Sequence, residues 1–249
     1  MIEIKHRDGR VLHVDREAYD VREAVMSATE ARVDLSGARL DGAELSGLDL
    51  ERAHLAGASL DGTRFDGSNL EDADLSHASL VGATLRGANI EDATLEGADL
   101  SRAVLDGANL ENAVLSEAIL VGASLRRANL ERTRLAGARA AGAVLVRSNL
   151  ERADLRGADL SGADLSGANV ERAELVDARL GDAKLRGANL ERCDLRGADL
   201  TGADLREANL ERCDIDRARM GGVLLDSANV ENLSGEPATG SISTGGPYR

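Results

Sequence analysis

The chain has 249 residues and a formal net charge of −14, from 44 acidic and 30 basic side chains. It contains one Phe, two Tyr and no Trp, which disfavours an aromatic-lined ligand pocket and base stacking on nucleic acid. The negative charge would repel phosphate backbones, so we expect no direct nucleic-acid binding. No apolar run is long enough to span a membrane and no signal peptide opens the chain, so we expect a cytoplasmic protein that does not bind membranes.

The start of the chain, over 1–16, is expected to form a β-hairpin. A three-residue loop over 7–9, with Gly in the left-handed position, pairs Ile4 with Leu12 and Ile2 with Val14. This register places four apolar side chains on one face of the hairpin.

A helix is expected next, over about 20–31. Asp20 is a suitable N-cap with Glu23 three residues later. One face is apolar at helical spacing: Val21, Ala24, Val25 and Ala28. Residues 1–32 would then form a lid over the exposed backbone edge of the segment that follows, or alternatively a docking domain.

From residue 33 to residue 233 the chain repeats every five residues without an insertion. The third residue of each five is apolar at 40 positions from 35 to 230, and the residue two before it is mostly small, with Leu48 and Val223 as large exceptions. A helix needs apolar spacing averaging 3.6, whereas residues two apart face the same side of an extended segment. Gly is frequent at the last position, where a turn needs positive φ. Each five therefore predicts a short extended piece and a corner.

A second, longer period is superimposed on the five. Asn recurs at every twentieth position from 69 to 229. Glu recurs at every twentieth position from Glu51 to Glu231, and so follows each of these Asn residues by two positions. Four fives per coil would produce this pattern, so 40 fives would make about ten coils. At a strand spacing of about 4.8 Å the rod would be roughly 48 Å long.

Four sides follow from four fives per coil, and we number them by the positions of their central residues. Face 1 is centred on 50, 70 and so on to 230, and face 2 on 35, 55 and so on to 215. Face 3 is centred on 40, 60 and so on to 220, and face 4 on 45, 65 and so on to 225.

The repeat resembles the pentapeptide-repeat family, whose motif is Ala-(Asp/Asn)-Leu-X-X. Ala-Asp-Leu begins, for example, at Ala73, Ala153 and Ala203, and Ala-Asn-Leu at Ala108 and Ala188. The resemblance implies an all-β fold, namely a right-handed quadrilateral parallel β-helix with the Leu and Ala columns inside. The expected organisation is therefore a hairpin-plus-helix cap over 1–32, a solenoid over 33–233 and a disordered tail over 234–249.

The outward charges are unevenly distributed over the four sides. Face 1 carries 13 acidic and 6 basic residues, a net charge of −7, and face 2 carries 10 acidic and 4 basic residues, a net charge of −6. Faces 3 and 4 come to −1 and +1. On face 1 the segment from Glu71 to Glu111 is expected to lack compensating Arg. The candidate partner-binding residues are Asp49, Glu51, Glu71, Asp72, Asp74, Glu91, Asp92, Glu96, Glu111 and Glu117.

Two interpretations of the acidic faces stand side by side. Stacked charges can simply solvate the rod and pair across coils, at about 0–1 kcal/mol per pair. Alternatively, they present carboxylates to a basic surface on a protein partner. The resemblance adds a specific version, because family members that mimic duplex DNA bind DNA gyrase or topoisomerase IV and protect them from poisons. This chain departs from those members in having almost no Phe in the central column, no projecting loops and no C-terminal dimerisation helix.

Catalytic, cofactor and metal sites are not expected. The four His residues are scattered, and no phosphate loop, zinc spacing or nucleophile motif occurs. Cys193 and Cys213 lie one predicted coil apart in the small inward column, where they are expected to be buried thiols. Ala140 replaces Leu at mid-rod and should leave either a local void or a pinched coil.

Overall fold

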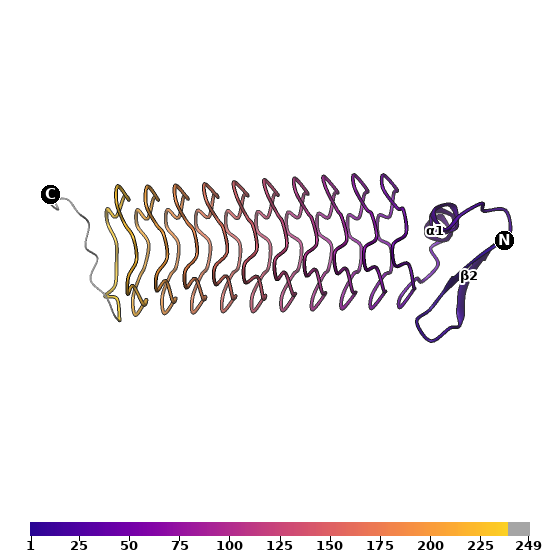
Figure 1. Cartoon of the computed structure of the whole chain (residues 1–249), viewed down its shortest axis with the longest axis horizontal. Coiled ribbons are helices and arrows are strands. Elements are labelled where there is room, and N and C mark those ends of the chain that lie inside the picture. The colour runs from indigo at the N-terminus through magenta and orange to yellow at the C-terminus, as the bar shows by residue number, and fades with distance from the viewer. Residues whose placement is uncertain (239–249) are drawn as a thin grey trace.

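The computed structural model describes residues 1–238, which form a straight rod with a small cap at its N-terminal end (Figure 1). The cap contains strands β1 (Ile2–Lys5) and β2 (Val11–Asp15), which pair antiparallel, and helix α1 (Val21–Glu30). Helix α1 has 10 residues. Within the described part of the chain, no helix has the length and apolar character needed to cross a membrane.

Each five-residue repeat forms one side of a coil because it ends in a β-turn. In the repeat centred on Leu35, the N–H of Ala38 donates to the Leu35 carbonyl at 2.9 Å, and Gly37 has φ 69°. A positive φ at the third residue of a turn is characteristic of type II, which favours Gly there. The positive φ recurs at every fifth residue from Arg32 to Asn232. The predicted corner in each five is confirmed.

The Asp or Asn before each centre has a local structural cause. Its side-chain oxygen accepts the N–H two residues later, as Asp74 does from Ser76 at 2.9 Å and Asn69 does from Glu71 at 3.3 Å. Such short polar side chains stabilise turns by bonding to nearby backbone. The motif is therefore explained by two inward residues that fill the core and one outward residue that satisfies a turn N–H.

Successive coils are joined by parallel bridges between equivalent positions of neighbouring coils. The series runs from Arg39 with Ser59 to Asp214 with Ser234. This spacing confirms the predicted coil of four fives. Because each side pairs with the same side of the next coil, the rod exposes unpaired backbone edges only at its ends.

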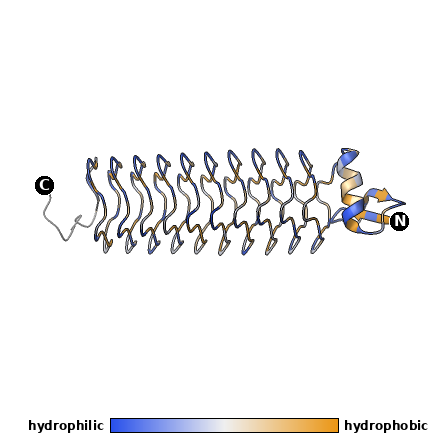
Figure 2. Cartoon of the chain, turned by 90° about the horizontal axis from the view of Figure 1, so that it is seen from above, coloured by the Kyte–Doolittle hydropathy of each residue, from blue (hydrophilic) through white to orange (hydrophobic). Residues whose placement is uncertain are grey.

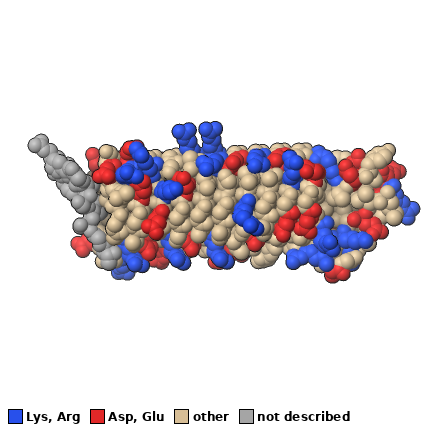
Figure 3. Space-filling model, in the orientation of Figure 1, with Lys and Arg blue, Asp and Glu red and all other residues tan. Residues whose placement is uncertain are grey.

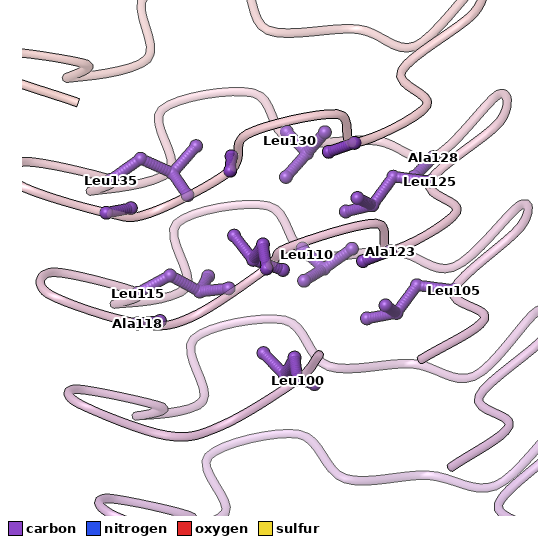
Figure 4. Close-up of a cluster of buried hydrophobic side chains, with 14 of the residues drawn as sticks. Leu100, Leu105, Leu110, Leu115, Ala118, Ala123, Leu125, Ala128, Leu130 and Leu135 are labelled. Atoms are coloured by element: carbon purple, nitrogen blue, oxygen red, sulfur yellow. The ribbon is translucent and has the colours of Figure 1, made fainter. Parts of the chain in front are cut away.

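The core consists of stacked inward columns. Figure 4 shows leucines of successive coils pointing into the same interior, with Leu105 below Leu125 and Leu110 below Leu130. In Figure 2 apolar and polar residues alternate along every coil. The central residues from 35 to 225 are all at most 5% exposed. Four inward hydroxyl groups are also buried and donate to backbone carbonyls: Thr63, Ser68, Thr133 and Ser148.

Ala140 leaves a void rather than a pinched coil. The Leu120 N–H lies 2.7 Å from the Arg139 carbonyl, and the Ala140 N–H lies 2.7 Å from the Asp159 carbonyl. Both distances match those in other coils, so the backbone does not close in. An apolar cavity of about 10 Å³ remains beside Ala140, lined by Leu and Ala side chains.

The hairpin has the expected three-residue loop. The N–H of His6 donates to the Arg10 carbonyl at 2.9 Å, and Gly9 has φ 94°. His6 also forms an antiparallel bridge with Ala38. The hairpin therefore occupies part of the first coil's backbone edge.

The predicted register of the hairpin strands is wrong. A bulge beside Lys5 shifts the pairing by one residue, giving Ile4 with His13, Ile2 with Asp15 and Glu3 with Val14. The cause lies outside the hairpin, because β2 turns polar groups toward α1. His13 Nε2 lies 2.9 Å from the Ser27 hydroxyl, and that hydroxyl donates to Asp15 at 2.6 Å.

Helix α1 begins at an Asp N-cap. The Asp20 carboxylate accepts the N–H of Glu23 at 2.9 Å, as predicted. The buried face consists of Ala24, Val25 and Ala28. Val21 was expected on this face but is 39% exposed, because it lies at the first residue of the helix where the chain enters from solvent.

The coil pairing continues beyond the expected boundary at residue 233. The Ile215 N–H donates to the Ser234 carbonyl at 2.9 Å, and the Ala238 N–H donates to the Ala218 carbonyl at 2.8 Å. Residues 234–238 therefore lie against the preceding coil instead of starting a disordered tail. The rest of that predicted tail lies outside the described residues.

Candidate interaction surface

An asparagine ladder runs along face 1. It consists of Asn69 and every twentieth residue to Asn229, and each side-chain amide donates to the residue one coil earlier at 2.9–3.1 Å. The amides all point the same way, and the last acceptor is the carboxylate of Asp49. A charged acceptor strengthens a hydrogen bond, so the Asp49 carboxylate ends the ladder favourably at its N-terminal end.

The ladder also holds part of the Glu column. Asn89 donates its second amide hydrogen to Glu71 Oε2 at 3.0 Å, and Asn109 donates to Glu91 Oε2 at 3.0 Å. Longer contacts of 3.4 and 3.5 Å reach Glu111 and Glu171. One carboxylate oxygen of Glu71 and one of Glu91 are thereby fixed. Coil spacing then places neighbouring carboxylates about 4.8 Å apart along the rod.

The corners of face 1 are strained. All ten of its corner positions from 52 to 232 hold Arg, Asp or Asn with φ of 55–60°, whereas eight of the ten corners of face 3 hold Gly. A left-handed conformation costs an L-residue roughly 1–2 kcal/mol, and less for Asn or Asp. Strain of this kind gathers at functional surfaces, so face 1 keeps side chains where stability alone favours Gly.

Ion pairs divide face 1 into neutralised and open parts. Arg52 pairs with Glu51 at 2.7 Å and with Asp72 at 3.1 Å. Arg132 pairs with Glu111 at 3.1 Å and with Glu131 at 3.0 Å. The expectation that nothing compensates the segment from Glu71 to Glu111 is therefore wrong for Asp72 and Glu111.

Three carboxylates between these pairs remain without a cation. Within residues 1–238, Glu71, Glu91 and Asp92 form no ion pair. We call these three residues the open acidic segment. Later in the same column four Glu residues lie beside an Arg at 3.5–3.7 Å: Glu151, Glu171, Glu191 and Glu211. Glu231, in the last coil, lies beside Asn232 and forms no ion pair within residues 1–238. The open acidic segment is thus set apart by the absence of neighbouring Arg, not by a different backbone.

Face 2 repeats this division. Asp74, Glu96 and Glu117 form no ion pair among the described residues, and Glu96 and Glu117 are exposed. Farther along, hydrogen bonds from the Arg156 guanidinium lower the pKa of Asp154. The remaining candidates, Asp49 and Glu51, lie at the start of face 1. The structure therefore brings unpaired carboxylates together on two adjacent faces between residues 71 and 117.

The N-terminal end of the rod carries a groove, and two thiols lie in the interior. A groove of about 710 Å³ lies between α1 and the first coils, lined by charged side chains with Met26, Val33 and Leu48. No cluster of three or more His, Cys, Asp or Glu within residues 1–238 has metal-binding geometry. Cys193 and Cys213 are free and buried, and burial raises the pKa of the Cys193 thiol well above its usual value.

Sequence reasoning missed two features of this surface. The hydrogen bonds of the asparagine ladder were not predicted, although Asn and Glu visibly recur once in every coil. The pairing of Arg52 and Arg132 with carboxylates of neighbouring coils was also missed, because it depends on side-chain reach between coils.

Comparison with known proteins identifies the repeat. The pattern of the family described as pentapeptide repeats matches in 8 copies, over residues 34–72, 68–107, 95–132, 133–172, 173–212 and 203–233. No curated protein sequence matches the chain.

Two solved structures show what the chain is similar to. HetL, a pentapeptide repeat protein involved in heterocyst differentiation regulation from the cyanobacterium Nostoc sp. strain PCC 7120, is 35% identical, with a TM-score of 0.50. The match covers 85% of this chain and 93% of HetL. QnrB1, a plasmid-mediated fluoroquinolone resistance protein, is 22% identical over 74% of this chain and 91% of its own, with a TM-score of 0.49. The family match and the similarity to HetL support a right-handed β-helix, and the chain belongs to the pentapeptide repeat family.

Proposed function

We propose that the protein is a non-catalytic interaction rod that presents acidic groups to a basic surface of a protein partner. The observation that carries this proposal is the open acidic segment, Glu71, Glu91 and Asp92, which lacks ion pairs within residues 1–238. Partly ordered carboxylates lose little side-chain entropy on binding, and their unscreened charge raises the association rate. HetL, a similar pentapeptide repeat protein, is involved in heterocyst differentiation regulation, and a regulatory role of that kind favours contact with other proteins.

The experiment is a pull-down with the full chain at low and high salt. Raising the salt from about 0.01 M to about 1 M shortens the Debye length from roughly 30 Å to roughly 3 Å, so specific acidic contacts should weaken strongly. The test variant carries Glu71→Gln, Glu91→Gln and Asp92→Asn.

The matched control carries Glu171→Gln, Glu191→Gln and Glu211→Gln, so both variants lose three acidic charges. These residues lie in the same column as Glu71 and Glu91, but each is already paired with Arg. We expect the test variant to lose the salt-sensitive partner and the control to retain it. Equal retention by both variants would remove the open acidic segment as the binding surface.

A type II topoisomerase such as DNA gyrase or topoisomerase IV is the second candidate partner, through mimicry of duplex DNA. Straight columns of carboxylates on two adjacent faces favour it. Faces 1 and 2 together carry a net charge of −13. Over a rod of about 48 Å, this is one net negative charge per roughly 3.7 Å of length, compared with one per about 1.7 Å in duplex DNA. A gyrase supercoiling assay with and without a quinolone tests this candidate. No effect at micromolar protein would exclude it.

A further inference from the structure

Face 3 lies opposite face 1 and carries few side chains at its corners. Eight of its ten corners are Gly, and the residue after each centre is uncharged in every coil from Val81 to Gly221. Its net charge is −1. Figure 3 shows how uncharged residues cover broad stretches of the rod between edges lined with charge.

The middle of face 3 carries an apolar spot. Val121 is 39% exposed and is the one large hydrophobic residue in that exposure class between residues 27 and 223. Ile119 lies beside it at the outward position of the same repeat. A single exposed hydrophobic residue is ordinary, so the argument depends on what surrounds the pair.

Opposite charges flank Ile119 along the rod. Asp99 pairs with Ile119 through a coil bridge on one side, and Ile119 pairs with Arg139 on the other. Neither Asp99 nor Arg139 forms an ion pair within residues 1–238, although the next residues in the column, Asp159 and Arg179, do so at 3.5 Å. Asp99 and Arg139 thus lie one coil before and one coil after Ile119, each outside any ion pair of the described residues.

We propose that face 3 binds face 3 of a second copy of this chain, with the two rods antiparallel. A two-fold axis across the rods at the level of Ile119 makes the contact self-complementary. Ile119 and Val121 then meet their own counterparts, and Asp99 of each copy meets Arg139 of the other. A parallel arrangement would place Asp99 against Asp99 and Arg139 against Arg139, which opposite-charge pairing disfavours.

This contact leaves face 1 free. Because faces 1 and 3 lie on opposite sides of a four-sided coil, the pair of rods exposes an open acidic segment on each of its two outer sides. The inference goes beyond the proposed function and does not depend on it, because self-association is measured without any other partner.

The test is sedimentation of the full chain over a range of concentrations at low salt. We expect a concentration-dependent dimer that dissociates as salt rises. Arg139→Asp and Asp99→Arg should each raise the dissociation constant at least about tenfold. The double variant Asp99→Arg/Arg139→Asp should restore it, because the reversed pair is again complementary.

The matched control is Arg134→Asp on neighbouring face 2. It makes the same change of charge at a nearby height and at a residue that forms no ion pair within residues 1–238. We expect its dimer to be unchanged. A wild-type chain that stays monomeric at high concentration, or a double variant no better than the single ones, would overturn the proposal. Circular dichroism melts establish that each variant is folded.

Cross-linking tests the orientation separately. In the antiparallel pair, residue 101 of one copy lies near residue 141 of the other, whereas 101 and its own counterpart are about two coils apart. A mixture of Ser101→Cys and Ala141→Cys chains should cross-link with a short bis-maleimide, and neither variant alone should do so. Because Cys193 and Cys213 are buried, the reagent reaches only the introduced thiols. Cross-linking of Ser101→Cys with itself would refute the antiparallel arrangement.

Discussion

Replacing Ala140 with Leu should stabilise the rod, although most substitutions in a packed core destabilise. The cavity of about 10 Å³ beside Ala140 lies at a position where Leu120 and Leu160, one coil away on each side, are accommodated at the same backbone spacing. Three added carbons contribute about 0.8 kcal/mol each, and ordering the side chain costs about 0.5–1 kcal/mol. The expected gain is therefore at most about 1.5–2 kcal/mol, because a cavity of about 10 Å³ is smaller than three added carbons and the neighbouring leucines must move to admit the rest.

The assay is the denaturant midpoint of the full chain, with Ala138→Leu as the control. Ala138 lies in the small inward column of the same coil and is 1% exposed, so the same added volume should overpack the core there and cost about 1–3 kcal/mol. Opposite shifts of the two midpoints support the account. A lower midpoint for both variants would show that the interior has no room for Leu at 140 and would refute the reasoning.

Four further outcomes are expected. Leu105→Lys should abolish cooperative unfolding because it buries an unpaired charge, while Val104→Lys on the outside of the same repeat should leave the melting curve nearly unchanged. The pKa of Asp15 is lowered to about 2, mainly by the Ser27 hydroxyl, so its contribution is complete above the unfolded pKa of about 3.9 and is lost as pH falls toward 2. Asp15→Asn should therefore flatten that acid dependence in a stability-against-pH series. Asn129→Asp should cost about 1–3 kcal/mol at neutral pH, because it removes a ladder donor, and less in acid, as thermal melts at two pH values would show. Asp92→Gly should raise the free energy of unfolding by about 0.5–1 kcal/mol, because Gly relieves the left-handed corner. The same variant should bind the partner more weakly at low salt. An increase in both stability and binding would contradict the assignment of face 1.

The architecture of the rod was predictable because the residues that determine each side of a coil all lie within one five-residue repeat. The inward pair, the turn residue and the Asp or Asn before the centre are all set within five residues, and the bridge from Asn69 to Asn89 follows from the longer period of one coil. The hairpin was not predictable in the same way. Its register depends on contacts of His13 and Asp15 with Ser27, which lies in another element.

The candidate surface was only partly predictable for a similar reason. Counting charges by side identified the two acidic faces. It did not show which carboxylates are neutralised, because Arg52 and Arg132 reach into neighbouring coils. Those two contacts reduce the predicted open stretch of face 1 to Glu71, Glu91 and Asp92.

The central claim is that Arg neighbours, and not the repeat itself, decide which part of face 1 binds. The most direct measurement is the slope of affinity against salt for the captured partner, compared between the chain neutralised at the open acidic segment and the chain neutralised at Glu171, Glu191 and Glu211. The account predicts a clearly shallower slope for the first chain and a wild-type slope for the second. Identical slopes for the two chains would contradict it.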